Sequence, residues 1–546
     1  MRGGVNPGIA VAALAVLSSF ASAADRICNP GSTVTIAGTV GKAQEGGFVL
    51  EPFEVGAGVT EISITATQTA SLTLPGTPAG QIKNTLDFGT RGPNDTFRGW
   101  NHPTATFSSE SATRSYHRGS IVPGTWSVEV GVAAIIVGTT SDYSVSIVCS
   151  DPPRTVVPWT QLRSPDAPVS GDRGPDWYAG DLHVHSRDSS DSPGSLADRP
   201  NGSTVDAIGS YAQDVAKLDW LSLTDHNTDG HLDDLGAEQS EWSGKRLLII
   251  PGTEVTTYHG HTNWHGGAAA APEEAFVEYR TGPVWIRNPD SGALTVHSEG
   301  RSPNEIFDDV HARGALTQVN HPTQFNDPVS SNLCRGCAWD YPDTDWSRVD
   351  LFEVQTAPPG LNAVPNQTFL GPNPFTLTAI LMWDRLLLEG YRITGVGTSD
   401  DHRAGSSPSV TQSPIGTPAT VVYAKSLSEQ AILDALKAGH AYIRFWGPEG
   451  PHVELTAPEH PGRMMGDTIE AAATMLRARV VGGPAGQLLR IIHNGLPVGL
   501  VPVVGEDFTF DFPATGTGFW RIETVIGVSF QALTNPIFLE LPGAVE

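Results

Sequence analysis

The segment Trp177-Tyr-Ala-Gly-Asp-Leu-His-Val-His185 determines how the central part of the chain is interpreted. Its apolar and aromatic residues predict a buried strand, which ends in His183 and His185. Side chains two positions apart lie on the same face of a strand, so both imidazoles can bind one ion. The segment therefore predicts a strand that carries metal ligands at its carboxyl end.

The same arrangement recurs between residues 176 and 440, where apolar runs repeatedly end in His, Asp or Glu. These residues are Asp225 and His226 after residues 218–224, Glu254 after 247–253, His261 shortly beyond it, His321 after 315–320, and Asp400, Asp401 and His402 after 392–399. Each one alone could be a surface or hydrogen-bonded core residue. Buried ionisable groups, however, persist only when they are paired or coordinated. A parallel α/β barrel gathers its strand ends on one face, so the pattern predicts a metal site there.

The number of candidate ligands exceeds the roughly four of one tetrahedral zinc, so two or three divalent ions are expected. Imidazole and carboxylate groups suit Zn, Mn and Fe alike. Clustered cations lower the pKa of bound water from about 15.7 toward about 7, so the attacking group would be a metal-bound water.

The domain organisation is predicted from the residue patterns within this region and on either side of it. Residues 176–440 alternate strand-like and helical patterns, as in βα units. Residues 24–150 and 441–546 consist of short β-branched and aromatic runs between turn residues, which predicts a β-sandwich at each end. A Pro-rich linker occupies residues 151–175. The loop of about residues 266–300 is expected near the barrel mouth or as a surface insertion.

Residues 1–23 have the features of a secretory signal peptide. Arg2 precedes an apolar run from Ile9 to Phe20, and small residues follow at Ala21 to Ala23. The run is shorter than the roughly 20 residues of a spanning helix, although an uncleaved anchor is the alternative. No later segment could span a membrane. The segment thus predicts a secreted, periplasmic or extracellular protein.

Export bears on the four cysteines. Cys28 and Cys149 stand at the two ends of the first β-rich region, and an oxidising compartment favours a disulfide between them. Two buried thiols are the alternative. Cys334 and Cys337 could form a local disulfide, a redox pair or half of a zinc site; the absence of a second pair favours the disulfide.

The net charge of the chain is −26. Phosphate backbones are bound by clustered Lys and Arg, so this charge argues against a nucleic-acid partner and against anionic membranes. A small-molecule substrate is the expected ligand.

Five motifs in the central region resemble, in order, those of the PHP (polymerase and histidinol phosphatase) superfamily. They are Asp181-Leu-His-Val-His-Ser, Leu223-Thr-Asp-His-Asn, Gly252-Thr-Glu, Val319-Asn-His-Pro and Ser399-Asp-Asp-His. The segments His185-Ser-Arg-Asp-Ser-Ser-Asp, Tyr258-His-Gly-His-Thr-Asn and Trp383-Asp-Arg-Leu-Leu resemble its CehA/McbA-like metallohydrolase branch, which includes carbamate-cleaving enzymes. The resemblance covers about residues 176–440. It implies a distorted (βα)7 barrel with a trinuclear centre, flanked here by the two sandwiches.

The resemblance also implies a ligand set. The first metal would be held by His183, His185, Glu254 and Asp400, the second by the bridging Glu254 with His261 and His321, and the third by His226, His402 and Asp191. The superfamily often has His at the position of Asp191, and Asp188 competes with Asp191 for this role. His259 or His265 could take the place of His261 if the loop is read in another register.

The expected function is a secreted metal-dependent hydrolase that acts on phosphoester, carbamate, ester or amide bonds. Asp225 and His259 are candidates for the acid or base, although both could instead orient ligands. Arg403 is a local cation that could attract a phosphate. The alternative is a metal-stabilised binding or adhesion protein with a non-catalytic barrel.

Overall fold

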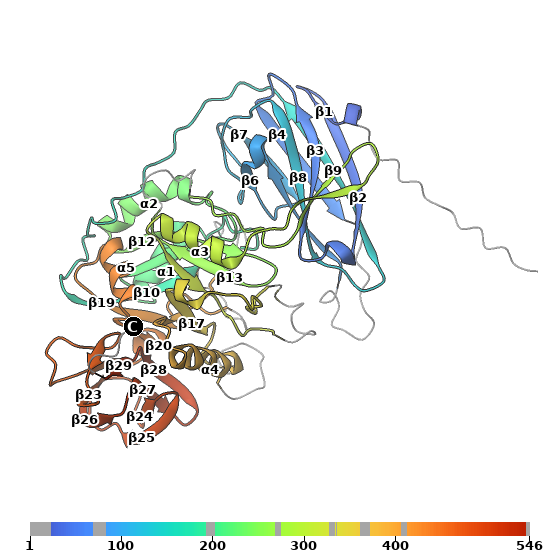
Figure 1. Cartoon of the computed structure of the whole chain (residues 1–546). Coiled ribbons are helices and arrows are strands. Elements are labelled where there is room, and N and C mark those ends of the chain that lie inside the picture. The colour runs from blue at the N-terminus through green and yellow to red at the C-terminus, as the bar shows by residue number, and fades with distance from the viewer. Residues whose placement is uncertain are drawn as a thin grey trace, which may run out of the picture.

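A computed structural model describes residues 23–68, 83–192, 202–267, 275–326, 334, 336–360, 372–405 and 412–541. The predicted signal peptide lies almost entirely outside these residues. Within them the chain is multidomain and rich in strands, and no helix is long and apolar enough to cross a membrane. Three regions follow one another along the chain (Figure 1).

The N-terminal region consists of two facing layers of mainly antiparallel strands (Figure 1). One layer contains β2 (Thr33–Gly41), β4 (Glu61–Gln68), β7 (Thr104–Ser108) and β9 (Thr140–Ser150). The other contains β1 (Ile27–Cys28), β3 (Phe48–Val55), β5 (Thr85–Arg91), β6 (Phe97–Gly99) and β8 (Gly124–Ala134). Buried and exposed residues alternate along β2 and β9, as expected for strands with one face on a core. Cys28 and Cys149 form a disulfide.

Two further strands of this second layer come from far along the chain. β14 (Val284–Arg287) pairs in parallel with β3, and β15 (Leu294–Ser298) pairs with β14. The expectation of a loop over residues 266–300 is therefore wrong for these strands. The two runs, Val284–Arg287 and Leu294–Ser298, have only four and five residues, which is too short to predict pairing with a strand so distant in sequence.

Buried charges connect this same segment to the sandwich. Arg91 of β5 is bidentate to Glu278, with distances of 2.8 and 3.1 Å, and also pairs with Glu129 of β8. Arg280 contacts both carboxylates from the other side. Tyr279 donates its hydroxyl to Glu129. The segment of residues 278–280 is thus fixed in the N-terminal domain.

The central region is a curved sheet with strand order β18-β17-β16-β13-β12-β11-β10-β19. The strands are β10 (Asp176–Val184), β11 (Trp220–Leu223), β12 (Leu248–Thr256), β13 (His261–His265), β16 (Leu316–Val319), β17 (Leu351–Thr356), β18 (Thr394–Thr398) and β19 (Ala419–Ala424). A parallel bridge between Val184 and Asp401 brings the end of β18 back to β10. Seven strands, β10 to β13 and β16 to β18, thus curl around a common interior.

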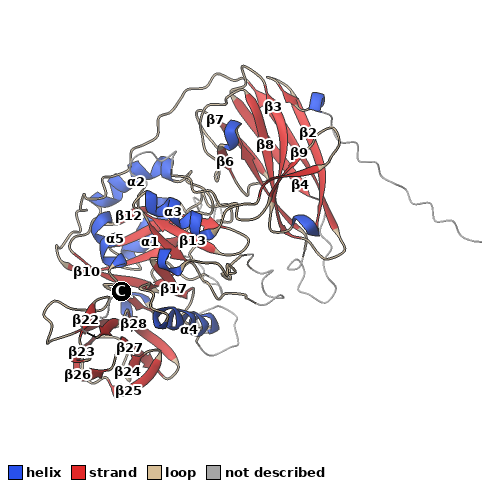
Figure 2. Cartoon of the chain, in the orientation of Figure 1, coloured by secondary structure: helices blue, strands red, loops and turns tan. Residues whose placement is uncertain are grey.

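This region departs from a regular βα repeat. β12 and β13 form an antiparallel pair, as do β13 and β16. The described residues contain five α-helices, which gather around this sheet (Figure 2). They are α1 (Val205–Asp214), α2 (Leu232–Gly244), α3 (Pro303–Ala312), α4 (Pro374–Leu388) and α5 (Glu429–Lys437). A strand followed by a helix seven times over is therefore not observed in the described part of the chain.

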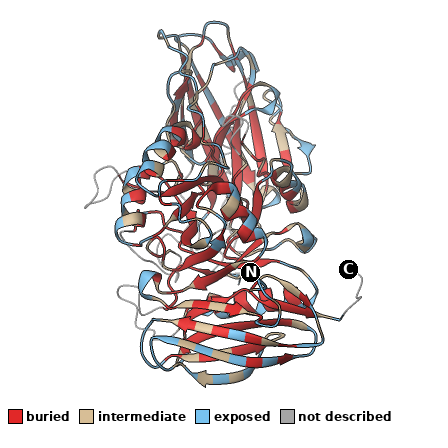
Figure 3. Ribbon diagram, turned by 90° about the vertical axis from the view of Figure 1, so that its left-hand side faces the viewer, coloured by how far each residue is buried: buried red, intermediate tan, exposed pale blue. Residues whose placement is uncertain are grey.

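Most of the C-terminal strands continue the central sheet, and three others form a separate one. β20 (Ala441–Arg444) pairs with β19 and then with β28 (Ser529–Thr534). The sheet proceeds through β27 (Gly518–Ile526), β24 (Leu488–His493) and β25 (Leu496–Pro502), with β29 (Ile537–Glu540) and β22 (Thr468–Glu470) at its side. A second sheet contains β21 (His452–Thr456), β23 (Ala473–Val481) and β26 (Asp507–Thr515). Buried residues run through all three regions (Figure 3).

Candidate metal centre

All nine residues predicted as metal ligands lie together at one end of the curled strands. His183 and Glu254 lie within β10 and β12, and His261 begins β13. The other six follow strand ends or lie on the loop after β10, namely His185, Asp191, His226, His321, Asp400 and His402. The chain folds this way locally because β10, β11, β12, β16, β17 and β18 are buried and present their carboxyl ends to the same interior.

Glu254 is the centre of this group, and its carboxylate is fully buried. Five imidazoles approach its two oxygens. The nitrogen–oxygen distances are 3.4 Å for His183, 3.5 Å for His185, 2.7 Å for His226, 3.1 Å for His261 and 3.3 Å for His321. One carboxylate shared by imidazoles on both sides has the geometry of a bridging ligand.

The buried atoms that lack a hydrogen-bond partner point to a cation. His183 Nε2, His185 Nε2 and Glu254 Oε2 are among them. The Oδ1 atom of Asp400 lies 3.4 Å from the first nitrogen and 3.3 Å from the second. Buried polar atoms are almost always satisfied, so convergent unsatisfied donors of metal-ligand type fit a divalent ion between them.

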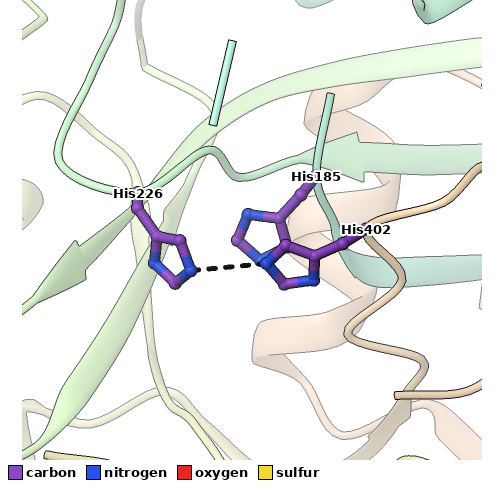
Figure 4. Close-up of side chains that lie close together, drawn as sticks. All are labelled: His185, His226 and His402. Atoms are coloured by element: carbon purple, nitrogen blue, oxygen red, sulfur yellow. Dashed lines mark hydrogen bonds between the residues drawn. The ribbon is translucent and has the colours of Figure 1, made fainter. Parts of the chain in front are cut away.

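A second group faces the first from the other side of His185. His185, His226 and His402 converge, with 3.4 Å between the Nε2 atoms of His226 and His402 (Figure 4). Asp191 Oδ2 lies 3.1 Å from His402 Nε2 and 3.4 Å from His226 Nε2. Asp188 instead borders a separate small polar hollow. The geometry thus favours Asp191 over Asp188.

The alternatives to His261 can be compared in the same way. His261 and His321 lie close enough to share an ion. His265 is hydrogen-bonded to Ser222 through Nδ1 and to Gln318 through Nε2. Burial lowers its pKa to about 3, so it stays neutral. Cys337 approaches His261 and His321, but its sulfur is in a disulfide with Cys334 and supplies no thiolate.

Within the cluster, Glu254 and His185 have pKa shifts that suit ligation, whereas the nearby carboxylates outweigh burial and raise the pKa of His183, His226, His321 and His402. Burial opposes ionisation of Glu254, but the surrounding imidazoles, with His226 foremost, lower its pKa well below the ordinary value. Burial lowers the pKa of His185 well below its ordinary value, and the neighbouring His402 and His226 lower it further. Metal ions bind ionised carboxylate and neutral imidazole, so both groups are in the binding-competent state.

Glu353 on β17 contacts the cluster, and the strand-end pattern did not reveal it. Its Oε1 atom lies 2.7 Å from His183 Nδ1, and it also accepts from Thr398. Its other oxygen accepts from the backbone N–H of His321. A carboxylate fixed in this way holds the His183 ring with Nε2 directed at Glu254 and Asp400. An acidic residue inside the apolar run Leu351-Phe-Glu-Val was the available signal.

We expect Glu353→Gln to weaken metal binding and to lower kcat/KM by about 10–100-fold, because the amide no longer fixes the His183 ring as a charged acceptor. Equilibrium dialysis and steady-state kinetics measure the two effects. Glu429→Gln is the control, since this equally buried carboxyl bonds to Gly267 away from the cluster. Equal loss in both variants would assign the effect to general destabilisation.

The two acid–base candidates lie away from the reacting region. Asp225 is fully buried, and its oxygens accept from the backbone N–H and the hydroxyl of Ser186, both at 2.6 Å. It therefore holds the backbone that follows His185. His259 is half-buried beside Gly46 of the N-terminal domain. Neither residue borders the cavity over the cluster, so the geometry favours a positioning role for Asp225 and gives His259 no contact with a substrate there.

A cavity of about 440 Å³ opens over the cluster. The central domain contributes Asp191, His226, His261, His321, Asp400 and His402, together with Tyr258. Phe48, Asp87, Trp100 and Asn101 come from the N-terminal sandwich. Tyr258 stacks on Phe48 at 5.5 Å and donates its hydroxyl to Asp87 at 2.8 Å. The sandwich is thus one wall of the cavity.

Comparisons with known proteins give distant structural matches. No protein-family model and no curated protein matches the sequence. One similar solved structure is a two-domain protein from Bacteroides vulgatus containing a predicted PHP-like metal-dependent phosphoesterase, with 17% identity over 70% of this chain and 100% of that chain and a TM-score of 0.34. Another is the lesion-specific endonuclease PfuEndoQ from Pyrococcus furiosus, with 16% identity over 52% of this chain and 62% of that chain and a TM-score of 0.29. Scores this low do not establish a common fold.

Proposed function

We propose that this chain is a metal-dependent hydrolase of the PHP superfamily, in its CehA/McbA-like branch, and that its curled central strands are a distorted (βα)7 barrel. The observation that carries the proposal is the convergence of two buried imidazole nitrogens without hydrogen bonds, His183 Nε2 and His185 Nε2, on the carboxylates of Glu254 and Asp400. Two or three divalent ions of Zn, Mn or Fe bound there would lower the pKa of a coordinated water and offset charge on the substrate oxygens.

The residues of the chain supply position and charge. His183, His185, Glu254 and Asp400 would hold the first ion, Glu254 with His261 and His321 the second, and His226, His402 and Asp191 the third. Glu353 orients His183 through Nδ1, and Asn320 Nδ2 donates to Glu254 at 2.9 Å. These contacts fix the ligands in advance, so little reorganisation is needed during the reaction.

The cavity favours a small neutral carbonyl substrate, namely a carbamate, ester or amide. Asp87, Asp191 and Asp400 border it, while no Lys or Arg does among the described residues that line it. A phosphate dianion or a nucleic-acid strand would meet these carboxylates without a compensating side-chain cation. Phe48, Trp100 and Tyr258 offer an apolar surface to the remainder of the substrate. A phosphoester is the second candidate, since bound cations alone could attract it.

We also propose that the protein is exported and cleaved after residue 23. The disulfides Cys28–Cys149 and Cys334–Cys337 support an oxidising compartment. The proposed domains are residues 24–150, 176–440 and 441–546, with a linker at 151–175. β14 and β15 belong structurally to the first of them.

Metal quantification on natively purified protein, followed by a substrate screen, tests the function. We expect two or three ions per chain and hydrolysis of aryl carbamates or esters with added Mn, Zn or Fe. Fewer than two ions would favour the alternative, a metal-stabilised binding or adhesion protein. Cleavage of a DNA oligonucleotide in the same screen would contradict the small-molecule assignment, and inactivity on carbamates, esters and aryl phosphates would contradict the hydrolase.

A further inference from the structure

The loop that carries Asp191 differs from the segments that carry the other candidate ligands. His183, His185 and Glu254 are fully buried on or directly after strands. Asp191 lies six residues beyond His185, and its side chain is 50% exposed. Its own loop therefore fixes it less firmly than a sheet would fix a strand-end ligand.

One side of this loop is held by the cluster itself. Ser189 Oγ donates to Asp191 Oδ1 at 3.2 Å. The same hydroxyl lies 3.1 Å from His185 Nδ1 and accepts from the backbone N–H of His226 at 3.2 Å. Ser189 thus joins the carboxylate to the imidazole of His185 and to the backbone of His226.

The other side of the loop is held by the N-terminal sandwich. Ser115 Oγ donates to the carbonyl oxygen of Asp188 at 2.6 Å. Arg114 Nη1 donates to the carbonyl oxygen of Ser192 at 2.6 Å and approaches that of Arg187 at 3.4 Å. Asn101 Nδ2 donates to Ser190 Oγ at 3.2 Å. Donors from the sandwich therefore bond to the loop on both sides of Asp191.

These donors are fixed in their own domain. The backbone N–H of Trp100 donates to the carbonyl oxygen of Ser115, and that of Tyr116 donates to Thr113. Tyr116 is buried against Phe107 in the sandwich core. The hydroxyl of Ser115 and the guanidinium of Arg114 are consequently presented from a packed scaffold, which is what a precise positioning contact requires.

We propose that Arg114 and Ser115 are positioning residues which hold Asp191 over His226 and His402, so that the N-terminal domain sets the affinity of the third cation site. The inference rests on the proposed metal centre. It gives the sandwich a part in assembling the active site across the domain boundary, in addition to forming a wall of the cavity.

The test compares metal dissociation constants and stoichiometry of the full chain in four forms: wild type, Arg114→Ala/Ser115→Ala, Asp191→Asn, and the combination of all three substitutions. Equilibrium dialysis with Zn²⁺ or Mn²⁺ measures them without reference to activity. We expect the double variant to weaken the most weakly held ion by about 10–100-fold. We expect the combined variant to bind no more weakly than Asp191→Asn, because positioning residues that act through a ligand add nothing once that ligand is removed.

Thr39→Ala is the matched control, because Thr39 bonds to Asp142 within the sandwich and not to the loop. Arg114→Lys, which keeps one donor for Ser192, should retain an affinity between those of the wild type and the double variant. An unchanged dissociation constant in the double variant would overturn the inference. So would a loss that adds in full to that of Asp191→Asn, since it would reflect general destabilisation. If the proposed metal centre is wrong, the wild type itself will bind fewer than two ions. This result would be seen before any variant is compared, and it would overturn both the metal centre and the positioning role of Arg114 and Ser115.

Discussion

In His183→Ala we expect loss of the first metal ion, which His183 would hold together with His185, Glu254 and Asp400. We also expect kcat/KM to fall by more than about 100-fold, which is more than the loss expected when a residue that only orients a ligand is removed. The imidazole provides one of the three unsatisfied buried atoms that converge at the site. It also lies between Glu254 and Glu353, so its removal leaves two buried carboxylates without their shared neighbour. Metal analysis and turnover of the substrate found by screening measure the result.

His265→Gln is the control for this variant. It replaces another fully buried imidazole of the same sheet whose nitrogens are already hydrogen-bonded to Ser222 and Gln318. We expect it to keep its metal content. Circular dichroism should show that both variants retain the strand-rich fold. Full turnover by His183→Ala would refute the ligand role of His183.

Arg91→Met is expected to lower the free energy of unfolding of the N-terminal domain by about 3–5 kcal/mol. The guanidinium is 2% exposed and pairs with the nearly buried Glu129 and with Glu278. Removing one member of a buried ion pair leaves uncompensated charge, which is the costly case. Urea denaturation followed by fluorescence and circular dichroism measures the loss.

The exposed pair of Arg477 and Asp511 supplies the matched control. Arg477→Met should cost less than about 1 kcal/mol, since a solvated pair contributes little. If the two variants lose comparable amounts of unfolding free energy, the burial of the Arg91 ion pairs is not the reason for their contribution to stability.

The same cluster predicts a dependence on pH. Burial raises the pKa of Glu278, but Arg91 and Arg280 outweigh it and lower this pKa from 4.5 to about 2. Because the pKa is lower in the folded state than in the unfolded state, the ionised carboxylate stabilises the fold at pH values above about 4.5. This contribution is lost as the pH falls from about 4.5 toward 2. Denaturation midpoints measured across this range should fall less steeply in Glu278→Gln than in the wild type.

Much of the candidate site could be predicted from the sequence because strand ends share one edge of a sheet. The expectation that ligands stand at the carboxyl ends of apolar strands needs no knowledge of the intervening loops. It was enough to select His183, His226, Glu254, His321 and Asp400. It could not find Glu353, whose oxygens act from within β17 on the side of His183 away from the cavity. Its only sequence signal is an acidic residue inside an apolar run, which does not depend on a strand end.

The domain arrangement was harder to predict. The sequence indicated separate sandwiches, and short strands do predominate at both ends of the described chain. Which strands pair across hundreds of residues is decided by complementary faces and edges, and these leave no local pattern. The pairing of β14 with β3 therefore had to be seen in the structure.

The pairing of β14 with β3 has a consequence for the order in which the chain can fold. Arg287 at the end of β14 bonds to Glu51 of β3 across a sequence separation of 236 residues. During synthesis from the N-terminus, residues 176–287 of the central domain must emerge before β3 acquires this neighbour. Until then the part of β3 from Phe48 to Leu50 is an open sheet edge, because β1 pairs only with Glu54 and Val55. An open edge is the kind of surface that recruits other chains. Contacts of such long range also slow folding. A chain cut after residue 150 would carry this open edge permanently, and we expect it to self-associate.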